Sequence, residues 1–445
     1  MTSGGPPEAR PSEPPVYRPF ALLAFGSTVL AGVPLGLAML GWLYLGAAAV
    51  DVERVRLHAG VQLFGFFGSL IAGVAHHLLP RFTGRAVRAT ALTPWLVGFL
   101  AVAMALRMAG AFGHSGAALA AGATVQAAAF AAFGVWVWRM LDAPPLRPLR
   151  HSLGAATAWL AAASALEGML RWLALGQGRA GPDPAGLQVV YAMALFGGVI
   201  GWVLGVLVRT GPMFVVDWQV PRGLVRAIPP TLALAIVVSA AAQVPRLDTA
   251  PATALARLGE LLALATVGVT LVAGGALRPA RRALPMASRS AAETRIFRLG
   301  LACAAAAMAG AAAATVLAML GQPAPLVADA LRHLVAVGFL TSLVVAMTFR
   351  LIPVLEGVPL PWPWLRTVAF WALLGAVLLR TSQVLVGAGG RPLAHGVAAS
   401  GLLVWVAIAC VTASLVSAMV RPVRRLPTGA SPPRATGPGD CRPRV

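Results

Sequence analysis

Twelve long apolar stretches, separated by short segments that carry arginine, proline and glycine, restrict this chain to a bundle of membrane-spanning helices. The chain is 58% hydrophobic and only 11% charged, and its mean hydropathy is +0.80. We therefore expect an all-α polytopic membrane protein. The stretches fall at about 20–46, 57–79, 91–112, 115–138, 152–175, 187–208, 227–244, 253–274, 297–320, 328–352, 366–388 and 393–419.

The positions of the arginines support this count. Arginines gather after the even-numbered stretches, as Arg81, Arg85 and Arg88 do after the second, while the connection from the third to the fourth has none. Basic loops remain on the cytoplasmic side, so both termini are predicted to be cytoplasmic. The net charge of +21 therefore comes from arginines in the loops, which set the orientation of the protein in the membrane, and it does not indicate nucleic-acid binding. The predicted parts are a disordered cytoplasmic tail (1–19), a twelve-helix membrane domain (20–420) and a disordered basic cytoplasmic tail (421–445).

The second, sixth and tenth stretches resemble one another. Each has a glycine 15 residues before a proline, in the pairs Gly65 and Pro80, Gly197 and Pro212, and Gly338 and Pro353. The steps between these pairs divide the chain into three blocks of four helices. We therefore predict three pseudo-symmetric arcs, each made of four helices.

Two histidines, His58 and His333, stand at the start of the second and tenth stretches. An imidazole inside a membrane segment is costly, which makes it a candidate functional residue. Counted back from Pro80 and Pro353 at about 1.5 Å per residue, both lie roughly 30–33 Å from the cytoplasmic end. Two imidazoles at one depth on different helices can bind one haem iron from its two faces. The alternative is a pair of hydrogen-bonded structural or interfacial histidines.

Three further residues near the same outer boundary fit a haem. Arg56 and Arg332 each come shortly before a histidine, where haem propionates need cationic partners. Tyr191, at the start of the sixth stretch, has a hydroxyl that can form a hydrogen bond with a haem substituent or a bound ligand. The alternative for the two arginines is that their side chains only extend to the membrane–water interface. The alternative for Tyr191 is that it anchors its helix at that interface.

Other polar residues in the stretches receive weaker assignments. His76 and His77 at the cytoplasmic end of the second stretch are candidates for a second metal site or a quinol pocket, and interfacial anchoring is favoured. Glu167 and Arg171 are spaced as an i, i+4 ion pair near the outer surface. A role in a proton path is the alternative for that pair.

The residues around the first histidine resemble a known family. The run His58-Ala-Gly-Val-Gln-Leu-Phe-Gly-Phe, ending in His76-His77-Leu-Leu-Pro80-Arg-Phe-Thr-Gly84, resembles the second helix of haem–copper oxidase subunit I, particularly the cbb3 type. It resembles still more the NnrS family of twelve-span bacterial proteins associated with the nitric oxide response. Tyr17-Arg18-Pro19-Phe20 is similar to the start of that family. The resemblance implies a subunit I-like fold, haem b with copper also allowed, and His58 and His333 as ligands of the haem iron. It also implies that the membrane is the bacterial inner membrane.

The chain also departs from the oxidases. They place a copper-binding histidine in the sixth span and a histidine pair beyond the seventh, whereas here the sixth offers Tyr191 and the seventh has no histidine. The oxidase His-x-His of the tenth span is His333-Leu-Val335. The resemblance therefore implies a haem protein of the nitric oxide response or of electron transfer, with haem-based redox or nitric oxide-handling activity, that is not a terminal oxidase. It implies nitric oxide as a candidate ligand, and a quinol or a respiratory-chain protein as a candidate partner.

Two alternatives come from other classes of protein. One is a transporter or permease without a cofactor, although transporters are usually built from two halves and this repeat is threefold. The other is an assembly partner of a respiratory complex.

Overall fold

The computed structural model describes residues 15–215, 218–243, 249–277, 291–322 and 325–421, and every regular element in these ranges is a helix. The predicted tails 1–19 and 421–445 lie largely outside the described residues. Val16 and Tyr17, which the prediction placed in the first tail, are buried against the bundle. The α-helices are α1 (Arg18–Ser27), α2 (Val33–Leu45), α3 (Val52–Gly60), α4 (Ser69–Phe82), α5 (Leu92–Phe112), α6 (Gly116–Leu141), α7 (Arg150–Gly176), α8 (Pro184–Ala192), α9 (Gly201–Thr210), α10 (Arg222–Ala241), α11 (Thr249–Ala273), α12 (Ala291–Met319), α13 (Pro325–His333), α14 (Ser342–Glu356), α15 (Leu365–Thr381) and α16 (Val386–Val420).

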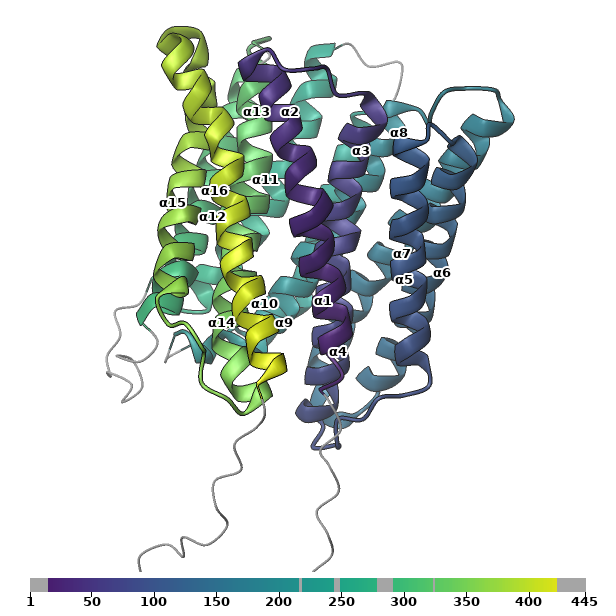
Figure 1. Ribbon diagram of the computed structural model, residues 1–445, viewed down its shortest axis with the longest axis vertical. Helices are drawn as coiled ribbons and strands as arrows, with labels where there is room; N and C mark the ends of the chain where they lie inside the picture. Colours follow the sequence, from purple (N-terminus) through teal and green to yellow (C-terminus); the bar gives the residue numbers. More distant parts are fainter. Residues whose placement is uncertain (1–14, 216–217, 244–248, 278–290, 323–324, 422–445) are drawn as a thin grey trace, which may run out of the picture.

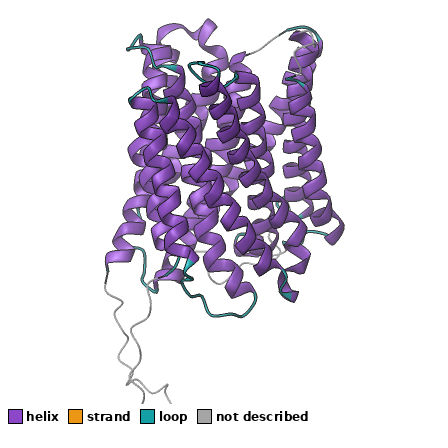
Figure 2. Ribbon diagram, turned by 90° about the vertical axis from the view of Figure 1, so that its right-hand side faces the viewer, coloured by secondary structure: helices purple, strands orange, loops and turns teal. Residues whose placement is uncertain are grey.

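The prediction of twelve membrane spans is confirmed, since the described residues contain 12 helical stretches long and apolar enough to cross a membrane. The main differences are at the ends. The second span begins at Val52 and not at residue 57, because the Asp51 side chain accepts a hydrogen bond from the Arg54 backbone at 2.9 Å and so caps the helix. The spans run side by side, and α1 begins at the same end of the bundle at which α16 ends (Figures 1 and 2). We call this the tail end, and the opposite one the far end.

The three repeated spans share an irregularity that the sequence pattern did not reveal. Each contains an eight-residue π-helix, namely η2 (Val61–Gly68), η4 (Met193–Ile200) and η7 (Leu334–Thr341). All three begin 19 residues before the repeated proline, so the repeat extends to backbone geometry. π-Helical turns are uncommon and are frequently found at functional sites.

The repeated glycine is the fifth residue of each π-helix, and close packing explains it. A Cβ added at Gly65 would lie 2.4 Å from Met104 Cε of α5, and one at Gly197 would lie 2.4 Å from Trp159 Cγ of α7. A Cβ at Gly338 would lie 2.8 Å from Cys303 Cβ of α12. In each block, therefore, a neighbouring helix packs directly onto the glycine.

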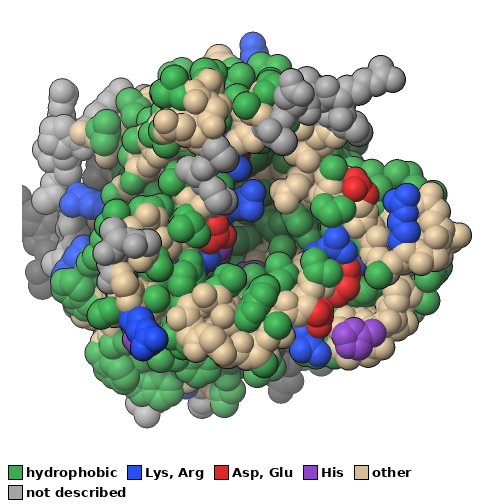
Figure 3. Space-filling view, turned by 90° about the horizontal axis from the view of Figure 1, so that it is seen from above, with side chains coloured by type: hydrophobic (Ala, Val, Ile, Leu, Met, Phe, Trp, Pro, Cys, Tyr) green, Lys and Arg blue, Asp and Glu red, His purple; other side chains and the backbone are tan. Residues whose placement is uncertain are grey.

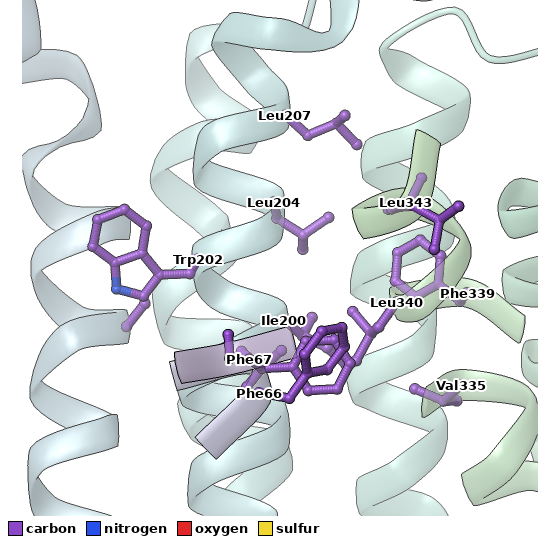
Figure 4. Close-up of a cluster of buried hydrophobic side chains, with 14 of the residues drawn as sticks. Phe66, Phe67, Ile200, Trp202, Leu204, Leu207, Val335, Phe339, Leu340 and Leu343 are labelled. Carbon is purple, nitrogen blue, oxygen red and sulfur yellow. The ribbon is translucent and has the colours of Figure 1, made fainter. Parts of the chain in front are cut away.

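The same three spans form the interior of the bundle. Buried residues make up 67, 61 and 61% of their apolar windows, against 28–50% in the other nine. Their side chains meet in one hydrophobic cluster, in which Phe66 and Phe67 of the first block face Ile200 of the second and Leu340 of the third (Figure 4). The last span closes the bundle against the first, because α16 packs on α2 and Trp405 Nε1 donates to the Val29 carbonyl at 3.1 Å.

Candidate functional site

His58 lies at the far end of the bundle, near the end of α3 and just before η2. Its Nδ1 is 2.7 Å from the carbonyl oxygen of Gly32, which ends the short π-helix η1 (Thr28–Gly32) of the first span. A carbonyl can only accept, so Nδ1 carries the proton and Nε2 of the neutral ring keeps its lone pair. The ring also lies against Gly36, where an added Cβ would come within 2.9 Å of Cε1. A metal-binding histidine needs this fixed tautomer.

His333, the last residue of α13, has a similar arrangement. Its Nδ1 is 2.8 Å from the Asp329 carbonyl one turn earlier, and 3.4 Å from an oxygen of the Asp329 carboxylate. Arg380 Nη2 is 3.4 Å from both ring nitrogens. One atom cannot align with two in-plane nitrogens that point apart, so the guanidinium lies against the ring and not in line with either nitrogen. Among the described residues, Nε2 of His333 is therefore contacted by Arg380 over the ring face and not along its lone pair.

The structure brings these two histidines into one neighbourhood. Asp329 and Arg380, which contact His333, also lie within electrostatic reach of the His58 imidazole, although His58 belongs to the first arc and the other three residues to the third. Seen from above, the far end is hollowed near its middle, with basic, acidic and histidine side chains at the walls of the hollow (Figure 3). The imidazole of His333 itself remains 29% exposed.

A polar network beside His333 was missed by sequence reasoning. Arg380 pairs with Asp329 at 2.6 Å, and Gln383 in η8 (Ser382–Leu385) donates to the same carboxylate at 3.1 Å. Nε and Nη1 of Arg380 are buried and have no hydrogen-bond partner in the described part of the chain. Two features of the sequence could have revealed this network. Arg380 lies inside the apolar stretch 366–388, where a charged residue is costly, and Asp329 lies four residues before His333.

The two arginines next to the histidines in sequence point elsewhere. Arg56 forms an ion pair with Glu53 and donates to the Pro182 carbonyl at 3.1 Å. Arg332 is exposed, and its charge acts on Glu260 of α11. Successive residues on a helix are about 100° apart, so proximity in sequence does not bring these side chains to the imidazole.

Glu167 and Arg171 form the expected pair at 2.9 Å, within a larger buried cluster. Arg107 of α5 donates to both oxygens of Glu167, at 3.0 and 2.5 Å, and Arg171 also reaches Glu53 of α3 at 3.1 Å. The predicted Tyr191 borders this cluster, and its buried hydroxyl has no partner among the described residues. The cluster connects α5 and α7 to the inner span that carries His58.

His76 and His77 point in different directions at the tail end. The His76 ring stacks on Trp136 with centroids 3.9 Å apart, and its Nδ1 is 2.8 Å from the Ala72 carbonyl. The His77 ring meets the edge of Tyr17 at 5.5 Å. Both histidines are buried, and no group of three or more metal-binding residues occurs in the described ranges.

Comparison with known proteins identifies the fold. No protein-family model matches the chain, and no curated protein matches it either. Among solved structures, the chain is similar to a heme-copper terminal oxidase dimer determined by cryo-EM, with a TM-score of 0.59 and 12% sequence identity. The match covers 92% of this chain and 84% of that one. The protein is therefore a multi-pass membrane protein with a haem–copper oxidase-like fold.

Proposed function

We propose that this protein is a haem b-binding membrane protein of the NnrS type, which acts in the nitric oxide response or in electron transfer. The observation that carries the proposal is the pair His58 and His333. They come from different arcs, each has Nδ1 engaged by a backbone carbonyl, and Asp329 and Arg380, which border His333, also lie within electrostatic reach of His58. Such imidazoles fit the axial positions of a haem iron.

The surroundings of the pair also fit a haem. Gly36 leaves no side chain between the first span and the His58 ring, and the hollow at the far end lies among charged groups and histidines (Figure 3). The unpartnered Nε and Nη1 of Arg380 are donors that suit a propionate carboxylate. Arg380 therefore replaces Arg56 and Arg332 as the proposed propionate partner, because Arg56 pairs with Glu53 and Arg332 lies near Glu260. Tyr191 remains a proposed contact for a haem substituent or a bound ligand.

Residues around the two histidines would hold the haem and influence its reduction potential. The Gly32 carbonyl keeps the proton on Nδ1 of His58, and Asp329 and Arg380 set the charge beside His333. A bound haem would supply one-electron chemistry, or a site for nitric oxide if one axial position were open. In the proposed orientation the far end faces the periplasm and the tail end faces the cytoplasm, with a quinol or a respiratory-chain protein as electron partner.

Absorption and EPR spectroscopy of the purified protein test this function. We expect a Soret band, a haem b pyridine haemochrome and a low-spin EPR signal, all lost or altered in His58→Ala and His333→Ala. His151→Ala, an exposed histidine at the start of α7, is the matched control and should leave the spectra unchanged. Metal analysis of the same sample tests for copper. A colourless, iron-free preparation of folded protein would refute the proposal.

A further inference from the structure

The helices α1, α4, α14 and α16 of the first and third arcs lie near one another toward the tail end (Figure 1). Residues of these four helices line a cavity there. The cavity is open on one side, and together with the solvent space in its mouth it measures about 450 Å³. Its walls are almost wholly apolar, from Ala21 and Phe25 on one side to Ile352 and Leu415 on the other. Apolar walls that carry only a few polar groups are typical of sites for small organic ligands.

One polar side chain in this apolar wall has no partner. His77 is only 3% exposed, and neither of its ring nitrogens forms a hydrogen bond within the described residues. A buried imidazole without hydrogen bonds is costly, and buried polar groups are nearly always satisfied. A ligand that brings a hydrogen-bonding atom into the cavity would satisfy it, and the Thr348 side chain lines the same space.

The charged groups beside the cavity are already paired. Glu356 is buried, and it accepts hydrogen bonds from the Tyr17 hydroxyl and from Arg18. Burial and this carboxylate raise the pKa of Tyr17 well above its usual range, so the phenol keeps its proton and remains a donor to Glu356. No free cation faces the cavity among its lining residues, so the site favours a neutral ligand over an anionic one.

We propose that this cavity binds the head group of a membrane quinone. A quinone ring has apolar faces that match the walls, and oxygens at its edge that pair with the imidazole of His77 and the hydroxyl of Thr348. His77 follows His58 by 19 residues, roughly 28 Å along the helix at about 1.5 Å per residue. The site is therefore separate from the candidate haem site, and the proposal does not rest on haem binding.

Binding of ubiquinone-1 to the full-length protein in lipid nanodiscs, measured by equilibrium dialysis, tests the proposal. We expect saturable binding of one molecule per chain. His77→Phe keeps the aromatic volume and removes both nitrogens, and should weaken binding at least tenfold. Ala21→Leu fills the cavity and should abolish binding. His76→Phe is the matched control, because that ring stacks on Trp136 and does not line the cavity, and it should bind within twofold of the wild type.

Three results would overturn the proposal. They are the absence of saturable binding to the wild type, wild-type affinity in both His77→Phe and Ala21→Leu, and displacement of ubiquinone-1 by equimolar oleate, which would indicate a general acyl-chain groove. Far-UV circular dichroism and size-exclusion chromatography check that each variant is folded. If either variant fails that check, a photoreactive azido-quinone decides the matter on the wild type, because it must crosslink to α4 or α14. Crosslinks confined to other helices would then be decisive against the site.

Discussion

His58 of the second span and Gly32 of the first are joined by a hydrogen bond of 2.7 Å from the imidazole Nδ1 to the backbone carbonyl. One helix therefore determines which nitrogen of a histidine on another helix is left free. The bond depends on the close approach of the two helices, which the glycines of the first span allow. It also makes the first span part of the proposed haem site, although that span contributes no ligand of its own.

Gly36→Ala should alter the haem spectrum while both histidines remain. The Cβ added at position 36 would lie 2.9 Å from Cε1 of His58. The imidazole ring must therefore move away from its present position. We expect a shifted Soret band and a weaker low-spin EPR signal. Gly26→Ala is the control, because an added Cβ there meets nothing within 4 Å. Identical spectra for the two variants would show that the His58 ring does not depend on this contact.

Arg380→Gln should lower the reduction potential of the haem. Loss of a positive charge near the iron stabilises the oxidised form. Arg380 Nη2 is 3.4 Å from Nε2 of His333, so it would lie about 5 Å from a bound iron, and a unit charge at that distance with an effective dielectric of about 20 corresponds to roughly 140 mV at most. Spectroelectrochemical titration measures the shift. Arg332→Gln, an exposed arginine directed toward Glu260, should change the potential by much less. If the two substitutions shifted the reduction potential equally, the haem would not lie next to Arg380.

Glu167→Gln should destabilise the protein by about 3–5 kcal/mol, because it leaves Arg107 buried with uncompensated charge and Arg171 with Glu53 as its remaining carboxylate. Denaturant unfolding in detergent measures the free energy. Asp142→Asn removes an exposed ion pair with Arg150 and should cost less than about 1 kcal/mol. If Glu167→Gln were as stable as the wild type, the cluster would not be structural, and the proton-path alternative would gain weight.

Gly197→Ala should cost about 1–3 kcal/mol of folding stability, because its Cβ would lie 2.4 Å from Trp159 Cγ and force the inner sixth span away from α7. Gly98→Ala is the contrasting change. It lies in the interior of α5, where a Cβ meets nothing within 4 Å, and should stabilise by about 0.5–1 kcal/mol. Thermal unfolding compares the two, and equal effects would contradict the role given to the repeated glycines.

The proposed orientation predicts which cysteines an impermeant thiol reagent can reach. The described cysteines Cys303 and Cys410 are buried, and the tail residue Cys441 is predicted to be cytoplasmic. In intact spheroplasts Cys441 should remain unlabelled until the membrane is permeabilised, whereas a cysteine introduced as His114→Cys in the far-end loop should be labelled at once. The reverse pattern would invert the topology.

Much of the fold follows from local properties of the chain. The twelve spans come from the length and hydropathy of each stretch, and the threefold repeat comes from the spacing of Gly65, Gly197 and Gly338 before their prolines. The common depth of His58 and His333 needs only residue counts and the helical rise. These quantities do not depend on how a helix is rotated against its neighbours.

The sequence alone determined a twelve-span helical membrane protein with three similar blocks, and it predicted two histidines at one depth. Only the tertiary structure decided which charged groups meet, because Arg380 and Asp329 are 51 residues apart and Arg107 and Glu167 are 60 apart, on different helices. A π-helical segment in each inner span also shifts the faces that a regular 3.6-residue period predicts. The rotation of each helix about its own axis, set by packing against glycines and neighbouring side chains, therefore selected the partners.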